Sequence, residues 1–408
     1  MAAPKYDLLV KGGHVFDPGQ ELDGRLDVAI AGGRIAAIQP DIPASDARRT
    51  IVVRGDNRYV VPGLIDLHTH VAHGATTAGV NWQGADPELA GVHSGATTVV
   101  DCGSTGAYNF GLFPTHVLPR AKTRILCLLN VGSHGLLYMH KQQADVPRLE
   151  DVDREAINGC IEANQQHIHG IKLRLVGPMV QERGQELVRL AKDIAVEHKL
   201  PLMVHIGEVI HESPNAPAIT RYLLKTLEPN DILTHLCTHH SGGVMDEHDL
   251  PIPELEEARA AGVVLDPASG RGNFAYDVAR RQADLGLHPD TISTDMSAPG
   301  RQEIIYSLME CMAKFMSLGY SLADVVRMTT VKAAKALHRE HELGAIAVGR
   351  EADLTIMDVV PGKWRFVDCR KQTFTGDQAV IPVQTIRAGE LFAPDWGPHP
   401  WGWLPEEA

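Results

Sequence analysis

Short apolar runs alternate with helical patterns along the middle of the chain, and this alternation limits the possible folds more than any other feature. Eight runs of strand length occur, at 61–70, 96–101, 124–131, 170–176, 201–206, 231–236, 262–266 and 290–295. Helical patterns lie between most of them, including residues 152–166, 181–198 and 252–261. Alternating strands and helices predict an α/β fold with a parallel sheet, and eight units predict a closed (β/α)8 barrel of the TIM type over residues 62–344.

An open, doubly wound parallel sheet is the structural alternative, because the same alternation also produces that fold. No G-x-G-x-x-G sequence follows the first run, and the chain has no Walker A sequence. A nucleotide-binding protein is therefore disfavoured.

Both ends of the chain are rich in short strand-like segments. Near the start, Gly12-Gly13 and Gly32-Gly33 each separate two such segments, a pattern typical of β-hairpins. Similar segments return at 352–358 and 380–387, before a turn at Gly389. These patterns predict a small, discontinuous β-sandwich domain built from residues 1–61 and 345–408.

The composition restricts the partners and the compartment. The 408 residues carry a formal net charge of −13 without a basic run, which argues against nucleic acid and anionic membranes as partners. No stretch approaches the roughly 18 uninterrupted apolar residues that indicate a transmembrane helix. The six cysteines form no C-x-x-C motif and the start lacks an apolar leader, so we expect a cytoplasmic protein with free thiols.

Two histidines, His68 and His70, close the first apolar run of the predicted barrel. Side chains at i and i+2 leave a strand on the same face, roughly 6.5 Å apart along it. Two imidazoles in that arrangement can converge on one metal ion at about 2.0–2.1 Å each. The pair therefore predicts a metal site and further ligands downstream.

Four more polar residues lie within or at the ends of later apolar runs: Lys172, His205, His235 and Asp295. The carboxyl ends of barrel strands face the catalytic mouth, so these side chains are expected to meet the two histidines there. Burying them is costly unless they are paired or bind metal. Each also has an ordinary interpretation, such as an ion-paired lysine, a hydrogen-bonded core histidine or a helix-capping aspartate. Six such residues in this order favour the metal centre.

The chain resembles the amidohydrolase superfamily of binuclear metal hydrolases, and within it the dihydroorotase-like deacetylase branch. The resemblance covers essentially the whole chain. The segments that carry it are Pro62-Gly-Leu-Ile-Asp-Leu-His-Thr-His, Gly170-Ile-Lys-Leu-Arg, Met203-Val-His-Ile-Gly-Glu, Thr234-His-Leu and Ser293-Thr-Asp.

The resemblance implies two divalent metal ions and a role for each of the six residues. His68, His70 and Asp295 would hold the more buried ion, and His205 and His235 the other. Lys172, carboxylated by CO₂, would bridge the two ions. A hydroxide bridging the metals would attack the substrate, with Asp295 as general acid and base. Zinc suits these ligands, although manganese, cobalt or iron also fit them.

Loops after the strands supply the expected substrate contacts, namely His134, His240, Arg271 and Asn273. His240 follows another histidine, His239. Arg271 is able to bind a carboxylate through two hydrogen bonds, or to form a surface ion pair instead. Arg174 is a further candidate, because it lies two residues beyond Lys172 on the same strand face.

We therefore expect a metal-dependent hydrolase that cleaves an amide or ester bond of a small molecule, either an N-acyl amino acid or an acylated hydroxy acid. A cyclic amidase, resembling dihydroorotase or hydantoinase, is the first alternative. A phosphotriesterase-like enzyme and a metal-free scaffold homologue are the others. The resemblance also implies a homo-oligomer.

Overall fold

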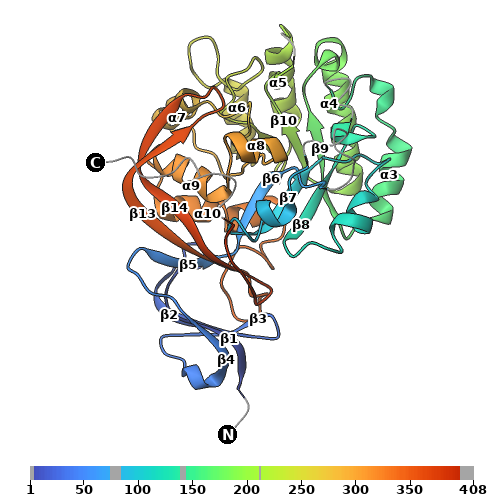
Figure 1. Cartoon of the computed structure of the whole chain (residues 1–408). Coiled ribbons are helices and arrows are strands. Elements are labelled where there is room, and N and C mark those ends of the chain that lie inside the picture. Colours follow the sequence, from blue (N-terminus) through green and yellow to red (C-terminus); the bar gives the residue numbers. More distant parts are fainter. Residues whose placement is uncertain (1–3, 74–83, 138–143, 211–212, 396–408) are drawn as a thin grey trace.

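The computed structural model describes residues 4–73, 84–137, 144–210 and 213–395, and a parallel sheet forms its centre (Figure 1). Seven neighbouring strands lie in chain order: β6 (Leu64–Thr69), β7 (Ala96–Cys102), β8 (Arg124–Asn130), β9 (Ile168–Arg174), β10 (Leu202–His205), β11 (Ile232–Thr234) and β12 (Val264–Asp266). Every neighbouring pair in this sheet is parallel. Seven of the eight predicted runs are therefore confirmed as strands of one parallel sheet.

The eighth run, residues 290–295, is not a strand, and that prediction is wrong. The segment still connects the two ends of the sheet through backbone hydrogen bonds. The Asp295 amide donates to the His68 carbonyl at 2.7 Å, and the Asp290 amide donates to the Leu265 carbonyl at 2.8 Å. The backbone of Asp295 has φ 51°, outside the β region, which interrupts a regular ladder there. Complete closure as an eight-stranded barrel stays a prediction.

Helices follow most strands and lie outside the sheet (Figure 1). They are α1 (Pro87–Ala90), α3 (Arg154–Ala163), α4 (Pro178–His198), α5 (Ala216–Thr226), α6 (Pro253–Ala260), α7 (Tyr276–Asp284), α8 (Ala298–Glu303), α9 (Leu308–Met316), α10 (Leu322–Met328) and α11 (Val331–Ala336). The three helical patterns of the sequence correspond to α3, α4 and α6. Within the described ranges, no helix has the length and apolar character needed to cross a bilayer.

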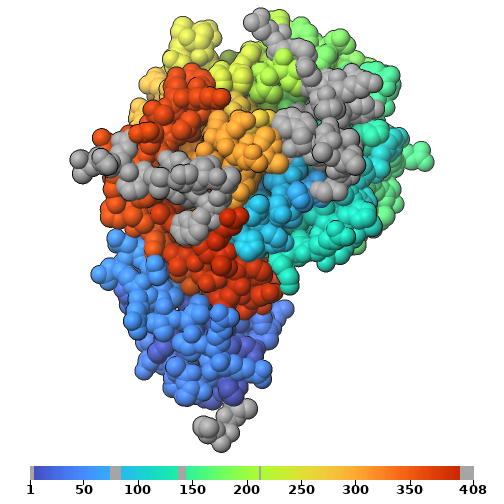
Figure 2. Space-filling view, viewed as in Figure 1, coloured from blue at the N-terminus to red at the C-terminus, as the bar shows by residue number. Residues whose placement is uncertain are grey.

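Strands from both chain ends form a second sheet. Its members are β1 (Tyr6–Asp17), β2 (Leu22–Ala31), β3 (Arg34–Gln39), β4 (Ala47–Val52), β5 (Arg58–Pro62), β13 (Leu354–Val367), β14 (Thr373–Arg387) and β15 (Glu390–Phe392). β5 pairs antiparallel with β13, which joins the start and end of the chain. In Figure 2 the blue N-terminal residues, at the bottom of the view, lie against red C-terminal residues. The two-layer sandwich and the domain boundaries stay predictions.

The two Gly-Gly pairs near the start behave differently. Gly32-Gly33 forms the predicted hairpin turn between β2 and β3, where Ala31 pairs with Arg34. Gly12-Gly13 lies inside β1, so the hairpin predicted there is wrong. The β1–β2 register shifts between Val10 and Gly13, and Gly12 has φ 70°, as in a β-bulge. A glycine at positive φ permits either a turn or a bulge, and strand pairing decides between them.

The β13–β14 hairpin connects the two parts of the molecule. The first half of β13 pairs with β5, whereas Trp364 and Phe366 in its second half join the large apolar core with α9 residues such as Phe315. Figure 1 shows this long ribbon, in red, running beside the parallel sheet to α7. Its tip, residues 368–372, therefore lies far from the terminal strands and beside the carboxyl ends of the parallel strands.

Candidate metal centre and active site

The structure brings the six predicted metal ligands together at the carboxyl ends of the parallel strands. Lys172 Nζ lies 3.2 Å from His68 Nε2. Asp295 Oδ1 lies 3.1 Å from His70 Nε2 and 3.5 Å from His68 Nε2. His68, His70 and Asp295 thus share one edge of the cluster, with Lys172 directly beside it.

His205 and His235 complete the cluster. Their ring centroids are 4.1 Å apart, and the ring of His235 is 5.2 Å from that of His68. The Nε2 atoms of His205 and His235 are buried and have no hydrogen-bond partner within the described ranges. Donor atoms of His68, His235 and Asp295 all lie within 4.8 Å of one another. Buried, unsatisfied imidazole nitrogens beside a carboxylate fit a divalent metal ion.

A second layer of polar residues holds the rings in place. His68 Nδ1 lies 3.0 Å from Thr234 Oγ1, and that hydroxyl donates to Asp266 at 2.7 Å. His70 Nδ1 lies 3.1 Å from Ser104 Oγ. These contacts occupy Nδ1 and leave Nε2 directed at the cluster, which is how outer partners orient metal-binding histidines.

Two further contacts complete this second layer. Ser104 Oγ donates to Asp101 Oδ2 at 2.7 Å, and His235 Nδ1 donates to the Ala268 carbonyl at 3.0 Å. Sequence reasoning missed Thr234, Asp266, Ser104 and Asp101. The available signal was weak, because each is a single polar residue in or just after an apolar run.

Burial determines the protonation of the cluster. It lowers the pKa of His235 to about 3, and it lowers the pKa of His68 and of His205 well below the ordinary histidine value. Burial also lowers the pKa of Lys172, which is fully buried. The neutral imidazole is the form that binds metal.

Asp295 keeps its charge in the same surroundings. Burial alone raises the pKa of its carboxyl, but the hydrogen bond with His70 and the electrostatic interactions with His235, His70 and Lys172 outweigh that effect. The net pKa is lowered. The backbones of His235 and Asp295 both adopt left-handed conformations, with φ 75° and 51°. Such backbone strain is concentrated at functional sites in proteins.

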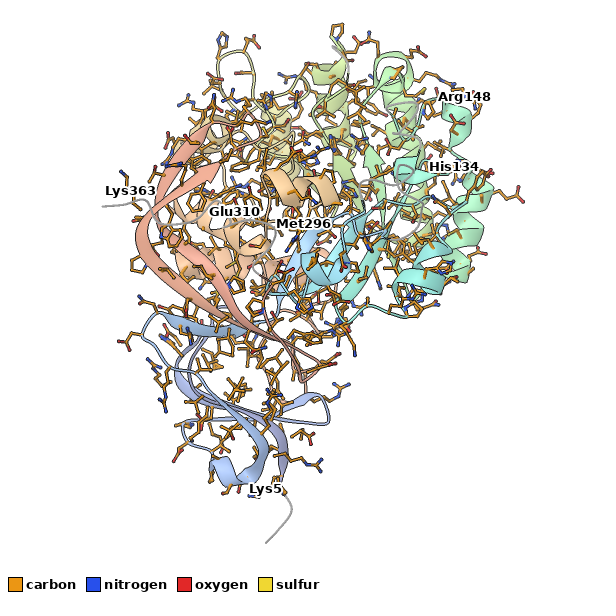
Figure 3. All side chains as sticks on the ribbon, in the orientation of Figure 1. Lys5, His134, Arg148, Met296, Glu310 and Lys363 are labelled. Carbon is orange, nitrogen blue, oxygen red and sulfur yellow. The ribbon has the colours of Figure 1, made fainter. Side chains whose placement is uncertain are left out.

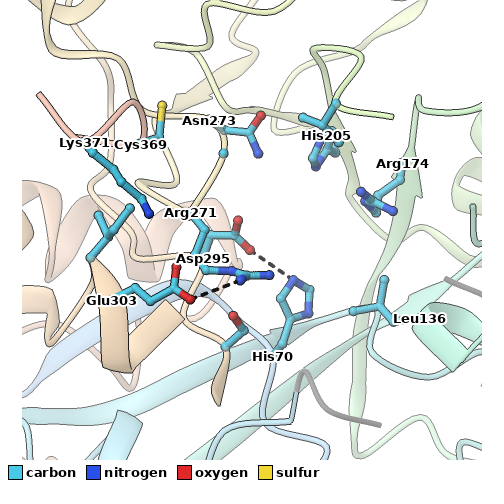
Figure 4. A pocket seen from close by; sticks show the side chains of 14 residues that line it. His70, Leu136, Arg174, His205, Arg271, Asn273, Asp295, Glu303, Cys369 and Lys371 are labelled. Carbon is cyan, nitrogen blue, oxygen red and sulfur yellow. Dashed lines mark ion pairs between the residues drawn. The ribbon is translucent and has the colours of Figure 1, made fainter. Parts of the chain in front are cut away.

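A pocket of about 370 Å³ includes three of the six cluster residues in its lining (Figure 4). These three residues are His70, His205 and Asp295. The other residues that line it are Leu136, Arg174, Val209, Arg271, Gly272, Asn273, Ser297, Glu303, Ile304, Cys369 and Lys371. Such a pocket suits a small molecule.

Two of the four predicted substrate contacts line this pocket, and two do not. Arg271 and Asn273 line it, and Arg271 lies 3.8 Å from Glu303. His240 instead hydrogen-bonds to the Gly272 carbonyl at 3.0 Å, which supports the loop that carries Arg271. His134 packs edge-on against Tyr108 and lies to one side of the labelled Met296 in Figure 3.

Cys369 and Lys371 are pocket residues that sequence reasoning missed. Both belong to the tip of the β13–β14 hairpin, in the part of the chain that was expected to form a separate small domain. No local motif marks them, since their place in the pocket depends on how the hairpin packs beside the parallel sheet.

Gly270 leaves room for the Asp295 carboxylate. A Cβ atom at Gly270 would lie 2.1 Å from Asp295 Oδ2, closer than non-bonded atoms approach. We expect Gly270→Ala to displace the carboxylate and to lower kcat/KM by about 100-fold, the effect of a misplacement near 1 Å. Steady-state kinetics on the metal-loaded protein provide the measurement.

Gly159→Ala is the matched control, because a Cβ at Gly159 would meet no described atom within 4 Å. Equal activity of the two alanine variants would show that Gly270 has no such role.

Comparisons with known proteins agree with the fold and the site. The amidohydrolase family model matches residues 59–392. A deacetylase of Brucella anthropi is 32% identical over 378 residues, which cover 90% of this chain and 89% of that protein. A deacetylase of Enterococcus faecalis is 29% identical, over 95% of this chain and 99% of its own length.

A solved structure shares both the fold and much of the length. The crystal structure of a dihydroorotase, 28% identical, matches with a TM-score of 0.81 over 95% of this chain and 99% of that one. Fold, site and relatives together define a hydrolytic enzyme. The chain belongs to the amidohydrolase family.

Proposed function

We propose that this enzyme is a metal-dependent deacetylase that hydrolyses an amide or ester bond in a small N-acyl amino acid or acylated hydroxy acid. One observation carries the proposal: four histidines and the ionised Asp295 carboxylate lie together with the buried Lys172, and three of these residues line a pocket with cationic side chains. Relatives named deacetylase align with about nine-tenths of the chain, and they support an acyl group as the part of the substrate that is removed.

The unsatisfied nitrogens of His205 and His235 support a bound metal at this cluster. Two divalent ions, for which zinc is well suited, would supply Lewis-acid activation of water and of the substrate carbonyl. The residues that would hold them are His68, His70, Lys172, His205, His235 and Asp295.

Lys172 requires a chemical change to take part. An ammonium group carries no lone pair for a metal, but burial lowers the pKa of Lys172 and favours the neutral amine. Its nitrogen can then bond to the carbon of CO₂ and release a proton, which leaves a carbamate with two anionic oxygens. Those oxygens would offset the charge of the metal ions next to His68.

Asp295 is the group placed to move a proton. Its side chain lines the pocket and is 17% exposed, and its pKa is lowered, so it is an ionised base at neutral pH. Asp295 would accept a proton from the attacking water and deliver it to the leaving amine or alcohol. Asn273 and Arg271 line the wall where the remainder of the substrate would bind.

A hydrolysis screen of the zinc-loaded protein tests the proposal. We expect turnover of N-acetyl amino acids or acetylated hydroxy acids, with a preference for one enantiomer because the pocket wall is asymmetric. The screen also includes dihydroorotate, hydantoins and phosphotriesters. Exclusive turnover of cyclic amides would show that the enzyme is a cyclic amidase instead. Exclusive turnover of phosphotriesters would show that it is a phosphotriesterase. A protein that holds no metal and hydrolyses none of these compounds would contradict it.

A further inference from the structure

The tip of the β13–β14 hairpin is a fixed part of the pocket wall. The Cys369 amide donates to the Phe274 carbonyl at 3.0 Å, and the Tyr276 amide donates to Asp368 at 3.2 Å. The rings of Tyr276 and Phe374 stack with centroids 3.6 Å apart. These contacts attach the hairpin to the start of α7, directly after the loop that carries Asn273.

Asp368 shapes the turn that presents Lys371. The Asp368 side chain is fully buried and accepts hydrogen bonds from the amides of Arg370 and Gln372, both at 2.9 Å. Lys371 has φ 60°, a left-handed conformation that is costly for a residue with a side chain. The turn is therefore built around a buried acid, and it places a lysine where glycine would be the less strained choice.

The cationic groups of the pocket differ in their partners. Arg271 lies 3.8 Å from Glu303, and Arg174 lies 3.6 Å from Asp145. Among the residues that the structure describes, no carboxylate forms an ion pair with the Lys371 amine. Figure 4 shows this side chain extending from the hairpin toward Arg271 and Asp295.

We propose that Lys371 is a specificity-determining residue that binds a free carboxylate of the substrate. This inference rests on the proposed function and names the residue that would bind the free carboxylate of the N-acyl amino acid or acylated hydroxy acid. The two arginines each face an acidic partner, whereas no described carboxylate pairs with Lys371, so its amine has the most to gain from an incoming carboxylate. The C-terminal hairpin would thus supply a residue that recognises the substrate, while residues at the ends of the parallel strands would catalyse its hydrolysis.

Paired substrates test the role of Lys371. The zinc-loaded enzyme is assayed with an N-acetyl amino acid and with the uncharged primary amide of the same compound. We expect Lys371→Met to raise KM for the acid by about 10- to 100-fold, the range for a charge-assisted hydrogen bond. KM for the amide should change by less than about 2-fold, and Lys371→Arg should keep most of the binding of the acid.

Lys363→Met is the matched control, since Lys363 is an exposed lysine of the same hairpin that lies outside this pocket (Figure 3). An unchanged KM for the acid in Lys371→Met, or equal changes for acid and amide, would overturn the inference while leaving the proposed function intact. Absence of any acyl hydrolysis by the unmodified enzyme would instead count against both.

Discussion

Replacing Asp295 with asparagine should lower kcat by about 10²- to 10⁴-fold, the contribution of a positioned general acid and base. Asparagine has nearly the same shape, and its side-chain oxygen is still able to face His70, which lies 3.1 Å from the native carboxylate. An amide cannot accept a proton from water at neutral pH. We therefore expect the metal content to stay close to that of the unmodified protein while turnover is lost.

The measurement combines steady-state kinetics with metal analysis of the same samples. Asp284→Asn, at an exposed position near the end of α7, is the control for removing one negative charge. Turnover of Asp295→Asn within about 3-fold of the unmodified enzyme would remove Asp295 from the proton-transfer role, because general acid–base catalysis contributes more than that. Loss of both metal and turnover would assign it to metal binding alone.

Removal of metal should abolish turnover and also destabilise the fold. Without a cation, the buried Nε2 atoms of His205 and His235 have no hydrogen-bond partner within the described ranges, and no Lewis acid activates water. A ligand at 100 times its Kd stabilises the folded state by about 2.7 kcal/mol. We expect dialysis against a chelator to lower both the activity and the Tm, and zinc with bicarbonate to restore them.

Chelated protein without added metal and protein reloaded with magnesium serve as the controls, because magnesium prefers oxygen ligands over imidazole. Full activity in samples that contain almost no metal would contradict the proposed chemistry. An unchanged Tm after complete metal removal would show that the cluster holds no ion in the folded protein.

Local patterns were sufficient to predict the parallel sheet and the cluster. The spacing of apolar residues that marks a strand or a helix can be recognised within a short stretch of sequence, so seven strands and the helices α3, α4 and α6 could be predicted. The high cost of burying Lys172 or His205 without a partner made these residues stand out in apolar runs. The strand predicted at residues 290–295 is wrong because the apolar pattern does not reveal the left-handed backbone at Asp295.

The sequence by itself determined which chemical groups lie at the strand ends, because side-chain type and period are local properties. Only the tertiary structure decided which distant groups meet. Three features depend on contacts between segments far apart in the chain: the pairing of Arg271 with Glu303, the bulge at Gly12 and the position of Lys371 in the pocket. Packing energy selects such contacts over the whole molecule, and no short stretch of residues encodes them.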